Sequence, residues 1–245
     1  MRQLPLDLAF EVVPTFDNFL VGANTAAVQH LCTLGASAAP VYLWGPPGCG
    51  KTHLLRALAQ RVQGGGGVVG SFGPGAPVPW ELGAGWSLVT VERCDELDDE
   101  AQRAAFALFE QATANAVAFA AAGRHPPADL ALRDDLRTRL GWGHVFALHP
   151  LSEAETRAAL RREADRRALF LSDEVMSHLL THHPRDLGYL NQLVERLDRF
   201  SLSKSRHVTV PLLRLMLAEE QAEDPGVAQA APTDTALGRR ARAAP

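Results

Sequence analysis

A run of eight residues, "GPPGCGKT" at positions 45–52, carries the clearest chemistry in the chain. It fits the pattern G-x-x-x-x-G-K-[ST], in which backbone N–H groups surround phosphate oxygens, the lysine reaches the β- and γ-phosphates, and the hydroxyl can ligate Mg²⁺. The run predicts a phosphate cradle whose candidate nucleotide-binding residues are Gly45, Pro46, Pro47, Gly48, Cys49, Gly50, Lys51, Thr52 and His53. The alternative is a glycine-rich turn that happens to end in Lys-Thr.

The segments on either side decide between these interpretations. Residues 40–45, "PVYLWG", read as a buried strand, and residues 51–62 have apolar side chains at helical spacing. A helix that begins at Lys51 would add its positive amino end to the cradle. Strand, loop and helix therefore follow one another as the motif requires, which favours the phosphate cradle. Cys49 is interpreted as a small space-filling residue rather than as a redox handle.

A second set of chemical residues follows the apolar run "SLVTVE" at positions 87–92. In a working P-loop ATPase such a strand ends in an acid that helps to hold Mg²⁺, and a second acid next to it activates water. Glu92 suits the first role, so Thr52 and Glu92 are the candidate Mg²⁺ ligands. Arg93 stands where the second acid belongs, and a guanidinium cannot accept a proton. We therefore expect the chain to bind nucleotide but to hydrolyse it poorly.

Two other interpretations of this segment stay open. Asp95 and Glu96 could supply the missing acid, although Arg93 and Cys94 would then interrupt the apolar strand. Alternatively, Arg93 pairs with a neighbouring acid on a solvated loop and has no bearing on the nucleotide.

The rest of the chain predicts the scaffold that holds these residues. Further strands are expected at 68–72, 116–121 and 144–149, with helices at 23–34, around 98–113 and at 133–140. This alternation predicts a parallel α/β sheet. After Pro150 only helical patterns occur, at 152–169, 172–182, 186–203 and 208–221. The expected parts are an extended tail (1–13), an α/β nucleotide-binding domain (14–150), a small all-helical domain (151–221) and a disordered tail (222–245).

Composition narrows the functional classes. The 245 residues carry a net charge of −4 and are 47% hydrophobic, so a core can form and a strongly basic nucleic-acid-binding domain is not indicated. Three scattered cysteines, Cys32, Cys49 and Cys94, favour a reducing compartment over disulfides or a zinc site. No apolar run approaches ~18 residues, and the amino end lacks the pattern of a signal peptide. A cytoplasmic protein without a membrane span is expected.

Several segments together resemble AAA+ proteins of the DnaA-related branch. They are "PTFDNFLVGANTAAV" (14–28), "GKTHLL" (50–55), "LRDDLRTRLGWG" (132–143), "PLSEAE" (150–155) and "PRDLGYLNQLVERLD" (184–198), in the family's order and spacing. The resemblance, over about residues 3–220, implies an AAA+ P-loop parallel sheet sandwiched by helices, with a small all-helical lid domain. It also implies an adenine nucleotide (ADP or ATP) and Mg²⁺ as ligands. The DNA-binding domain of DnaA itself has no counterpart after residue 221, which favours a regulatory member of the branch.

Four arginines acquire roles through this resemblance. Arg139 matches the family's arginine finger, which reaches toward the γ-phosphate held by a neighbouring subunit, and Arg137 would support that interface or contact the lid. Arg185 in "PRDL" matches the sensor arginine that reaches the nucleotide from the lid. Arg124 stands where the family's "DRPP" segment has an acid, which again suggests poor hydrolysis. The alternatives are an ordinary ion pair between Arg139 and Asp135, four residues earlier, and a helix-surface position for Arg185.

The amino-terminal run "QLPLDL" (3–8) resembles the Q-L-x-L-x-L peptide by which regulatory members bind the replicative sliding clamp. In that role, Gln3 would place its amide in a polar notch, and Leu4, Leu6 and Leu8 would fill an apolar groove. A six-residue motif also arises by chance, so the alternative is a solvated tail.

The function implied by the resemblance is regulation of the initiation of chromosome replication. Bound to the sliding clamp (the beta subunit of DNA polymerase III), the chain would present Arg139 to ATP-loaded DnaA, promote hydrolysis of that ATP and so prevent re-initiation. The expected partners are the clamp and DnaA. A homodimer or oligomer is compatible with this role, DNA contact would be indirect or weak, and the protein would act in the cytoplasm at the nucleoid and replisome. The alternatives are an autonomous AAA+ ATPase of the DnaA, helicase-loader or clamp-loader type, and an adaptor that ignores nucleotide.

Overall fold

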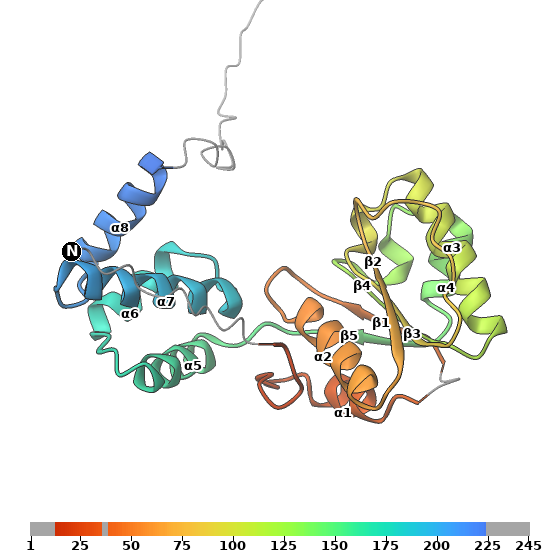
Figure 1. Cartoon of the computed structure of the whole chain (residues 1–245), viewed down its shortest axis with the longest axis horizontal. Helices are drawn as coiled ribbons and strands as arrows, with labels where there is room; N and C mark the ends of the chain where they lie inside the picture. The colour runs from red at the N-terminus through yellow and green to blue at the C-terminus, as the bar shows by residue number, and fades with distance from the viewer. Residues whose placement is uncertain (1–12, 36–38, 224–245) are drawn as a thin grey trace, which may run out of the picture. The chain divides into compact units, whose positions relative to one another are not determined.

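The computed structural model describes residues 13–35 and 39–223 of the chain. These residues form two compact units (Figure 1). One unit runs to Leu160 and includes Pro184–Leu190, and the other contains Arg161–His183 and the chain from Asn191 onward. The "QLPLDL" run lies outside the described residues.

A five-stranded parallel sheet forms the centre of the first unit. Its strands are β1 (Val41–Trp44), β2 (Val68–Phe72), β3 (Trp86–Val91), β4 (Ala118–Gly123) and β5 (His144–Ala147). They lie in the order β2-β3-β4-β1-β5, and every neighbouring pair is parallel. β1 therefore has a neighbour on each side, as expected for a strand that is apolar throughout.

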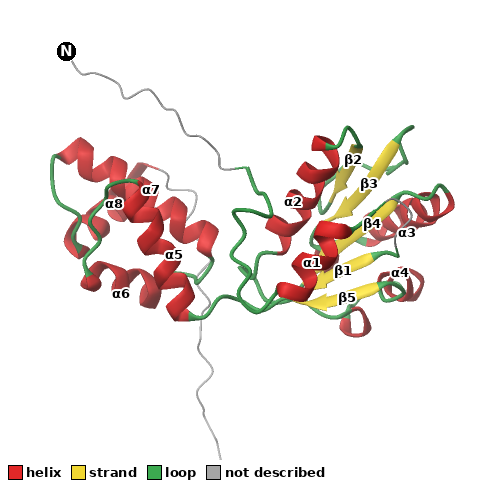
Figure 2. Ribbon diagram, turned by 90° about the horizontal axis from the view of Figure 1, so that it is seen from below, coloured by secondary structure: helices red, strands yellow, loops and turns green. Residues whose placement is uncertain are grey.

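Helices cover both faces of this sheet (Figure 2). α1 (Thr25–Thr33) and α2 (Lys51–Gly64) lie on one face, and α3 (Asp99–Ala114) and α4 (Asp134–Leu140) lie on the other. Side chains alternate between the two apolar clusters: Val41 and Leu43 pack with α1 and α2, whereas Tyr42 packs with α3 and α4. The predicted AAA+ parallel sheet sandwiched by helices is confirmed.

The junction between α3 and β4 differs from the prediction. The strand expected at 116–121 begins at Ala118. Ala116 has a left-handed φ of 56°, and the Val117 N–H donates to the Ala112 carbonyl at 2.9 Å. These two residues therefore close the end of α3 instead of opening the strand. The start of α3 is as expected, because the Asp98 side chain accepts the Ala101 N–H at 2.8 Å as an N-cap.

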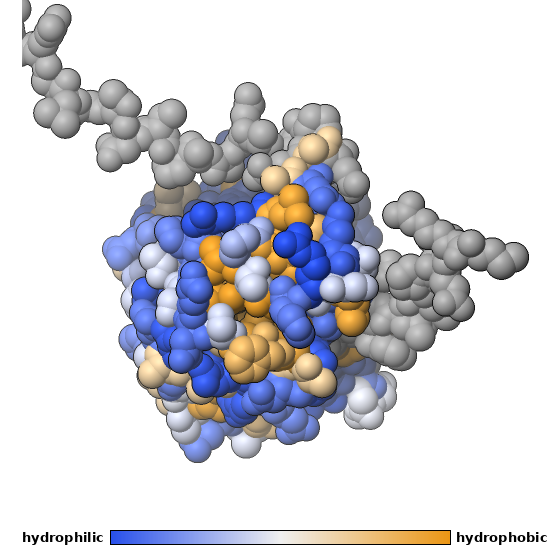
Figure 3. All heavy atoms as spheres, turned by 90° about the vertical axis from the view of Figure 1, so that its left-hand side faces the viewer, coloured by the Kyte–Doolittle hydropathy of each residue, from blue (hydrophilic) through white to orange (hydrophobic). Residues whose placement is uncertain are grey.

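Four helices follow β5 in the described chain: α5 (Glu153–Arg166), α6 (Asp173–His182), α7 (Leu187–Lys204) and α8 (Val210–Glu223). Their apolar faces are buried, as at Met176, Leu193 and Leu213. Three large apolar side chains of this described part are exposed, chiefly Phe170 at 82% and Leu202 at 72%, with Leu215 less so. Figure 3 looks onto this end of the molecule and shows an apolar area framed by hydrophilic residues. Among the described helices, none is both long enough and apolar enough to cross a bilayer.

A tight turn joins α4 to β5 and begins the pairing of β5 with β1. The His144 N–H donates to the Pro40 carbonyl at 2.8 Å. Just before it, a Cβ added at Gly143 would lie 1.9 Å from that same carbonyl oxygen. A Cβ added at Gly141, in the same turn, would meet nothing closer than 3.5 Å. The close approach of two backbone segments therefore requires glycine at 143 but not at 141.

Gly143→Ala is expected to lower the free energy of unfolding by about 1–3 kcal/mol, because its methyl group must displace a backbone carbonyl. Gly141→Ala is the matched control and should change that free energy by no more than ~0.5 kcal/mol. Urea unfolding followed by circular dichroism measures both values. Equal stabilities of the two variants would contradict the close packing at the start of β5.

Candidate functional site

The phosphate loop leaves the carboxyl end of β1 and leads directly into α2. Gly48 and Gly50 have φ angles of 78° and 95°, left-handed conformations that glycine adopts without strain. Gly50 is the N-cap of α2, and a Cβ there would lie 2.5 Å from the Phe19 ring. The backbone therefore has the curled path, followed by a helix amino end, that a phosphate cradle needs.

Lys51 folds back over this loop. Its Nζ donates to the Gly45 carbonyl at 2.6 Å and to the Pro46 carbonyl at 2.9 Å. An ammonium group needs acceptors, and here the carbonyls of the loop supply them. The oxygens of a β- or γ-phosphate would be charged and therefore stronger acceptors for the same group. Cys49 is buried beside Lys51, in keeping with a space-filling role.

Thr52 and Glu92 come together although they lie on different elements. The Thr52 hydroxyl, in the first turn of α2, donates to the Glu92 carboxylate at 2.9 Å, and Glu92 follows directly after β3. Among the described residues, the cation paired with this carboxylate is Arg56, whose Nε lies 3.7 Å from it. A hydroxyl oxygen beside a carboxylate is the hard oxygen chemistry that Mg²⁺ takes in phosphate sites, so these two residues fit that ion.

Arg93 and Arg124 are both engaged by the acids that follow β3. Arg93 has a left-handed φ of 49° and pairs with Glu96 at 3.0 Å. Arg124, which follows β4, pairs with Asp95 at 3.2 Å and with Glu96 at 2.7 Å, and its backbone N–H also donates to Asp95 at 2.9 Å. Two arginines and two carboxylates thus form one cluster at the end of β3 and β4, which we call the arginine–acid cluster.

This cluster bears on the three interpretations of the segment. The pairing of Arg93 with a neighbouring acid is present. Asp95 and Glu96, considered as substitutes for the missing acid, each contact an arginine and are thus engaged within the cluster. Cys94, between them, is fully buried, and burial raises the pKa of its thiol to about 12. The thiol is therefore neutral and is part of the core.

Tyr42 fixes the loop that carries Arg124. Its hydroxyl donates to the His125 carbonyl at 3.0 Å. Burial raises the pKa of this phenol well above its ordinary value, with the Cys94 thiol and the Asp95 carboxylate adding to the effect. The phenol therefore stays protonated and remains a donor to that carbonyl.

The segment with the predicted arginine finger forms α4 and the turn after it. Arg133 binds Asp135 through Nε and Nη2, at 3.2 and 2.7 Å, and this pairing lowers the pKa of the Asp135 carboxyl. Arg137 binds Asp134 at 2.6 Å. The ion pair considered between Arg139 and Asp135 is not among the described contacts, because Asp135 is occupied by Arg133.

Arg139 contacts two other residues instead. Its Nε lies 3.0 Å from the Glu110 carboxylate of α3. Its guanidinium carbon lies 5.2 Å from the centre of the Trp142 ring, within the range of a cation–π contact. The side chain is about one-third exposed, so it remains accessible from the surface.

Arg185, the predicted sensor arginine, is exposed and pairs with Glu153 of α5 at 3.1 Å. In the helical part of the chain, His178, His182 and His183 form a ring cluster, with the first two ring centroids 4.3 Å apart. Burial lowers the pKa of His178 and of His183. The described residues contain no group of three or more His, Cys, Asp or Glu suited to a metal ion, so the histidines are best explained as part of the helix packing.

The segment before α1 packs beside the phosphate loop. Asn24 is buried and exchanges two hydrogen bonds with the backbone of His149, at 2.8 and 2.9 Å. His53 Nε2 lies 2.9 Å from the Thr15 carbonyl oxygen, and the Phe19 ring lies beside the His53 ring. The predicted site residue His53 therefore anchors this segment to α2.

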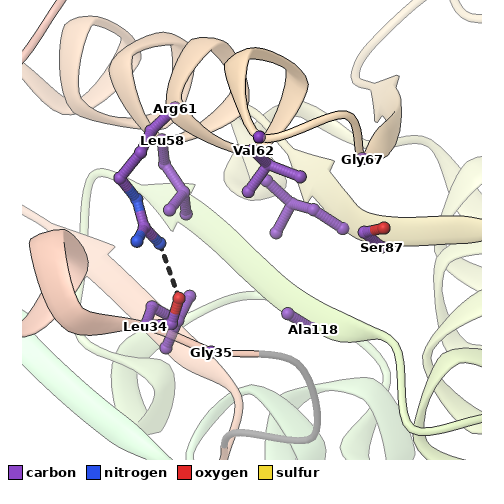
Figure 4. Close-up of a pocket in the computed structure, with 10 residues that line it drawn as sticks. Leu34, Gly35, Leu58, Arg61, Val62, Gly67, Ser87 and Ala118 are labelled. Carbon is purple, nitrogen blue, oxygen red and sulfur yellow. Dashed lines mark hydrogen bonds between the residues drawn. The ribbon is translucent and has the colours of Figure 1, made fainter.

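A pocket of about 230 Å³ lies at the amino ends of β3 and β4, the edge of the sheet opposite the phosphate loop (Figure 4). Leu58, Val62 and Ala118 line it. Its one charged group, Arg61, donates to the carbonyls of Cys32 and Leu34 and so ties α2 to the end of α1. The pocket is thus separate from the predicted nucleotide site.

Sequence reasoning missed three residues of the site, Arg56, Glu110 and Trp142. It also missed the ion pairs that Asp95 and Glu96 form with Arg124. Arg56 could have been found, because it follows Thr52 by one helical turn. Glu110 carried no signal, because its partner lies on another helix. Trp142 was within a recognised segment but had no assigned role.

Three family models match the chain, two of them in overlapping regions. The model for the lid domain of Hda matches residues 153–217, and the model for the bacterial DnaA ATPase domain matches residues 11–65. A general model for AAA ATPases associated with various cellular activities matches residues 41–119, which contain the phosphate loop and the strand before Glu92.

One curated protein and several solved structures are also similar to the chain. An uncharacterized protein of Haemophilus influenzae is 27% identical and covers 88% of this chain and 98% of its own length. Domain III of Thermotoga maritima DnaA superposes with a TM-score of 0.68 at 20% identity, covering 84% of this chain and 95% of that one. AMPPCP-bound DnaA from Aquifex aeolicus gives 0.64 at 19% identity, covering 86% and 70%.

At these identities the structural likeness shows the shared fold, and the family models carry the assignment further. A DnaA-type ATPase segment at the amino end, an intact phosphate loop and an Hda-type lid segment occur in one chain in that order. Together these matches support an Hda/DnaA-related AAA+ family for this chain.

Proposed function

We propose that this chain regulates the initiation of chromosome replication by promoting hydrolysis of the ATP bound to DnaA while it is held on the sliding clamp of DNA polymerase III. It would act in the cytoplasm, at the replisome, and prevent re-initiation. The family assignment supports a role in replication initiation, and the residues of the site support this particular form of it.

The observation that carries the proposal is a contrast within one chain between the residues that would bind nucleotide and the residues that would hydrolyse it. The phosphate loop is intact, but the positions next to it that would activate water are arginines already paired with acids. Arg139, by contrast, is accessible on the surface and carries a charge suited to a phosphate outside its own subunit. These residues suit a protein that holds a nucleotide and acts on the nucleotide of another.

The bound nucleotide is proposed to be ADP or ATP. The phosphate loop would hold its phosphates, Thr52 and Glu92 would hold Mg²⁺, and Arg185 would exchange its Glu153 partner for the nucleotide. When bound, Mg²⁺ supplies positive charge to the phosphates. Arg93 has no lone pair with which to accept a proton from water, so the nucleotide acts as a structural ligand.

The proposed clamp anchor lies outside the described residues and rests on sequence alone. Gln3, Leu4, Leu6 and Leu8 would bind the clamp, which would bring the chain near DNA. We also propose that two copies of this chain could form a homodimer through the surface that carries Arg139.

Lys51→Ala is expected to weaken binding of ADP and ATP by at least about tenfold, because the phosphates lose a charged hydrogen-bond donor. It should also remove the stabilisation that nucleotide gives to the folded chain. Equilibrium binding of a fluorescent nucleotide and thermal unfolding with and without ADP measure these effects. Unchanged affinity would remove the phosphate-cradle assignment.

Arg139→Ala should reduce stimulated hydrolysis of DnaA-bound ATP by about 10³-fold, the scale known for arginine fingers acting in trans. Nucleotide binding and clamp binding should not change, because the finger acts on the partner's phosphate. The assay follows ADP formation in a mixture of DnaA, DNA-loaded clamp and this chain. A parallel reaction without DnaA measures ATP hydrolysis by this chain alone, which would be high if the chain were an autonomous ATPase.

Arg103→Ala is the matched control for this assay, since Arg103 is an exposed arginine of α3 with no ion pair among the described side chains. It should stimulate DnaA as the wild type does. A fully active Arg139→Ala variant would place the finger elsewhere, and strong hydrolysis without DnaA would favour the autonomous ATPase.

Replacing Leu6 and Leu8 together by Ala should weaken clamp binding by about two orders of magnitude or more, since each buried leucine contributes roughly 1.5–3 kcal/mol. Thermal stability should not change. Binding to immobilised clamp is the measurement, with Leu202→Ala as a control for loss of an exposed leucine far from the tail in sequence. If the double variant binds as tightly as the wild type, residues 3–8 are a solvated leader.

A further inference from the structure

The guanidinium of Arg139 is supported on two sides within its own subunit. Glu110, near the end of α3, lies 3.0 Å from Nε. Trp142, in the turn after α4, presents its ring to the guanidinium carbon at 5.2 Å. α3 and α4 lie side by side on the same face of the sheet (Figure 1), so the support comes from packed helices and not from a free loop.

The side chain of Arg139 donates no hydrogen bond to another described residue. Its closest approach to Glu110 is through Nε at 3.0 Å, and neither Nη nitrogen is used in a hydrogen bond within the described chain. The other two arginines of this segment differ. Arg133 uses Nη2 as well as Nε on Asp135, and Arg137 uses Nη2 on Asp134. Arg139 is therefore the arginine of α4 whose terminal fork is available for an oxyanion.

The turn that carries Trp142 is itself held in place. The backbone N–H of Trp142 donates to the Arg139 carbonyl at 3.2 Å. The next residue, Gly143, lies against the backbone of Pro40. The indole is nevertheless 62% exposed, an unusual position for the largest apolar side chain. A tryptophan face is the best aromatic surface for a guanidinium, so the cation–π contact with Arg139 explains the exposed position of this ring.

We infer that Glu110 and Trp142 are positioning residues that set the direction of the Arg139 fork before a partner arrives; this inference rests on the proposed function. An unsupported arginine side chain must lose its rotamer freedom when it meets the phosphate, which slows the reaction. In this inference Glu110 holds the guanidinium electrostatically, Trp142 supports it through its ring, and the Nη nitrogens remain for the phosphate. The two supports act on the rate with bound partner and not on the affinity for it.

The test compares the maximal rate of stimulated DnaA–ATP hydrolysis with the concentration of this chain that gives half of it. Glu110→Gln keeps the shape and removes the charge, and Trp142→Ala removes the ring. Each is expected to lower the maximal rate by about tenfold, with the half-saturating concentration unchanged within about twofold. Trp142→Phe keeps a ring face and should restore most of the rate lost in Trp142→Ala.

Glu100→Gln is the matched control, because it removes the same charge from an exposed position at the other end of α3. It should behave as the wild type. Thermal unfolding of every variant accompanies the kinetics, and if Trp142→Ala fails to fold, Glu110→Gln and Trp142→Phe decide the matter.

Two results would overturn the inference. A wild-type maximal rate for Glu110→Gln would show that the carboxylate does not position the finger. A raised half-saturating concentration with an unchanged maximal rate would assign both residues to partner binding. Failure of the proposed function would look different, because the wild type would then give no stimulation or Arg139→Ala would remain fully active.

Discussion

Parallel pairing of β1, β3 and β4 is the constraint on which the candidate site depends. Trp44 lies opposite Gly123 in the register, so the residues that follow them, Gly45 and Arg124, leave the sheet at the same level. Glu92 leaves β3 at the same edge. Because the carboxyl ends of parallel strands share one edge, the phosphate loop, the metal-type carboxylate and the arginine–acid cluster come together without any long-range loop.

The energetics of that edge suggest what the arginine–acid cluster is for. Its ion pairs are partly exposed, and such pairs contribute only about 0–1 kcal/mol each to stability. A contribution of that size does not explain why four charged side chains gather beside a phosphate loop. Their effect is better described as engagement of the acids, since each carboxylate of the cluster that could orient water is paired with an arginine. Arg139, by contrast, contacts none of these acids, and its terminal nitrogens donate no hydrogen bond to another described residue.

Much of the fold and part of the site could be predicted because their signals are local. The phosphate loop is one contiguous run, and the strands β1 and β4 at the centre of the sheet are apolar throughout. Contacts between elements could not be predicted in the same way. The sequence offered Asp135 as the partner of Arg139 through helical spacing, but Arg133 is closer to that carboxylate in the fold and binds it through two nitrogens. Glu110, the actual partner, lies on a different helix.

The shared use of Asp95 and Glu96 by two arginines makes these four positions depend on one another during evolution. An acid in place of Arg93 alone would leave Arg124 as the single cation among three carboxylates, and like charges at this spacing repel. An acid in place of Arg124 alone would take both of its ion pairs away at once. The first such substitution leaves the cluster with an excess of two negative charges, and the second doubles that excess. The arrangement is therefore easier for a lineage to keep than to leave one mutation at a time.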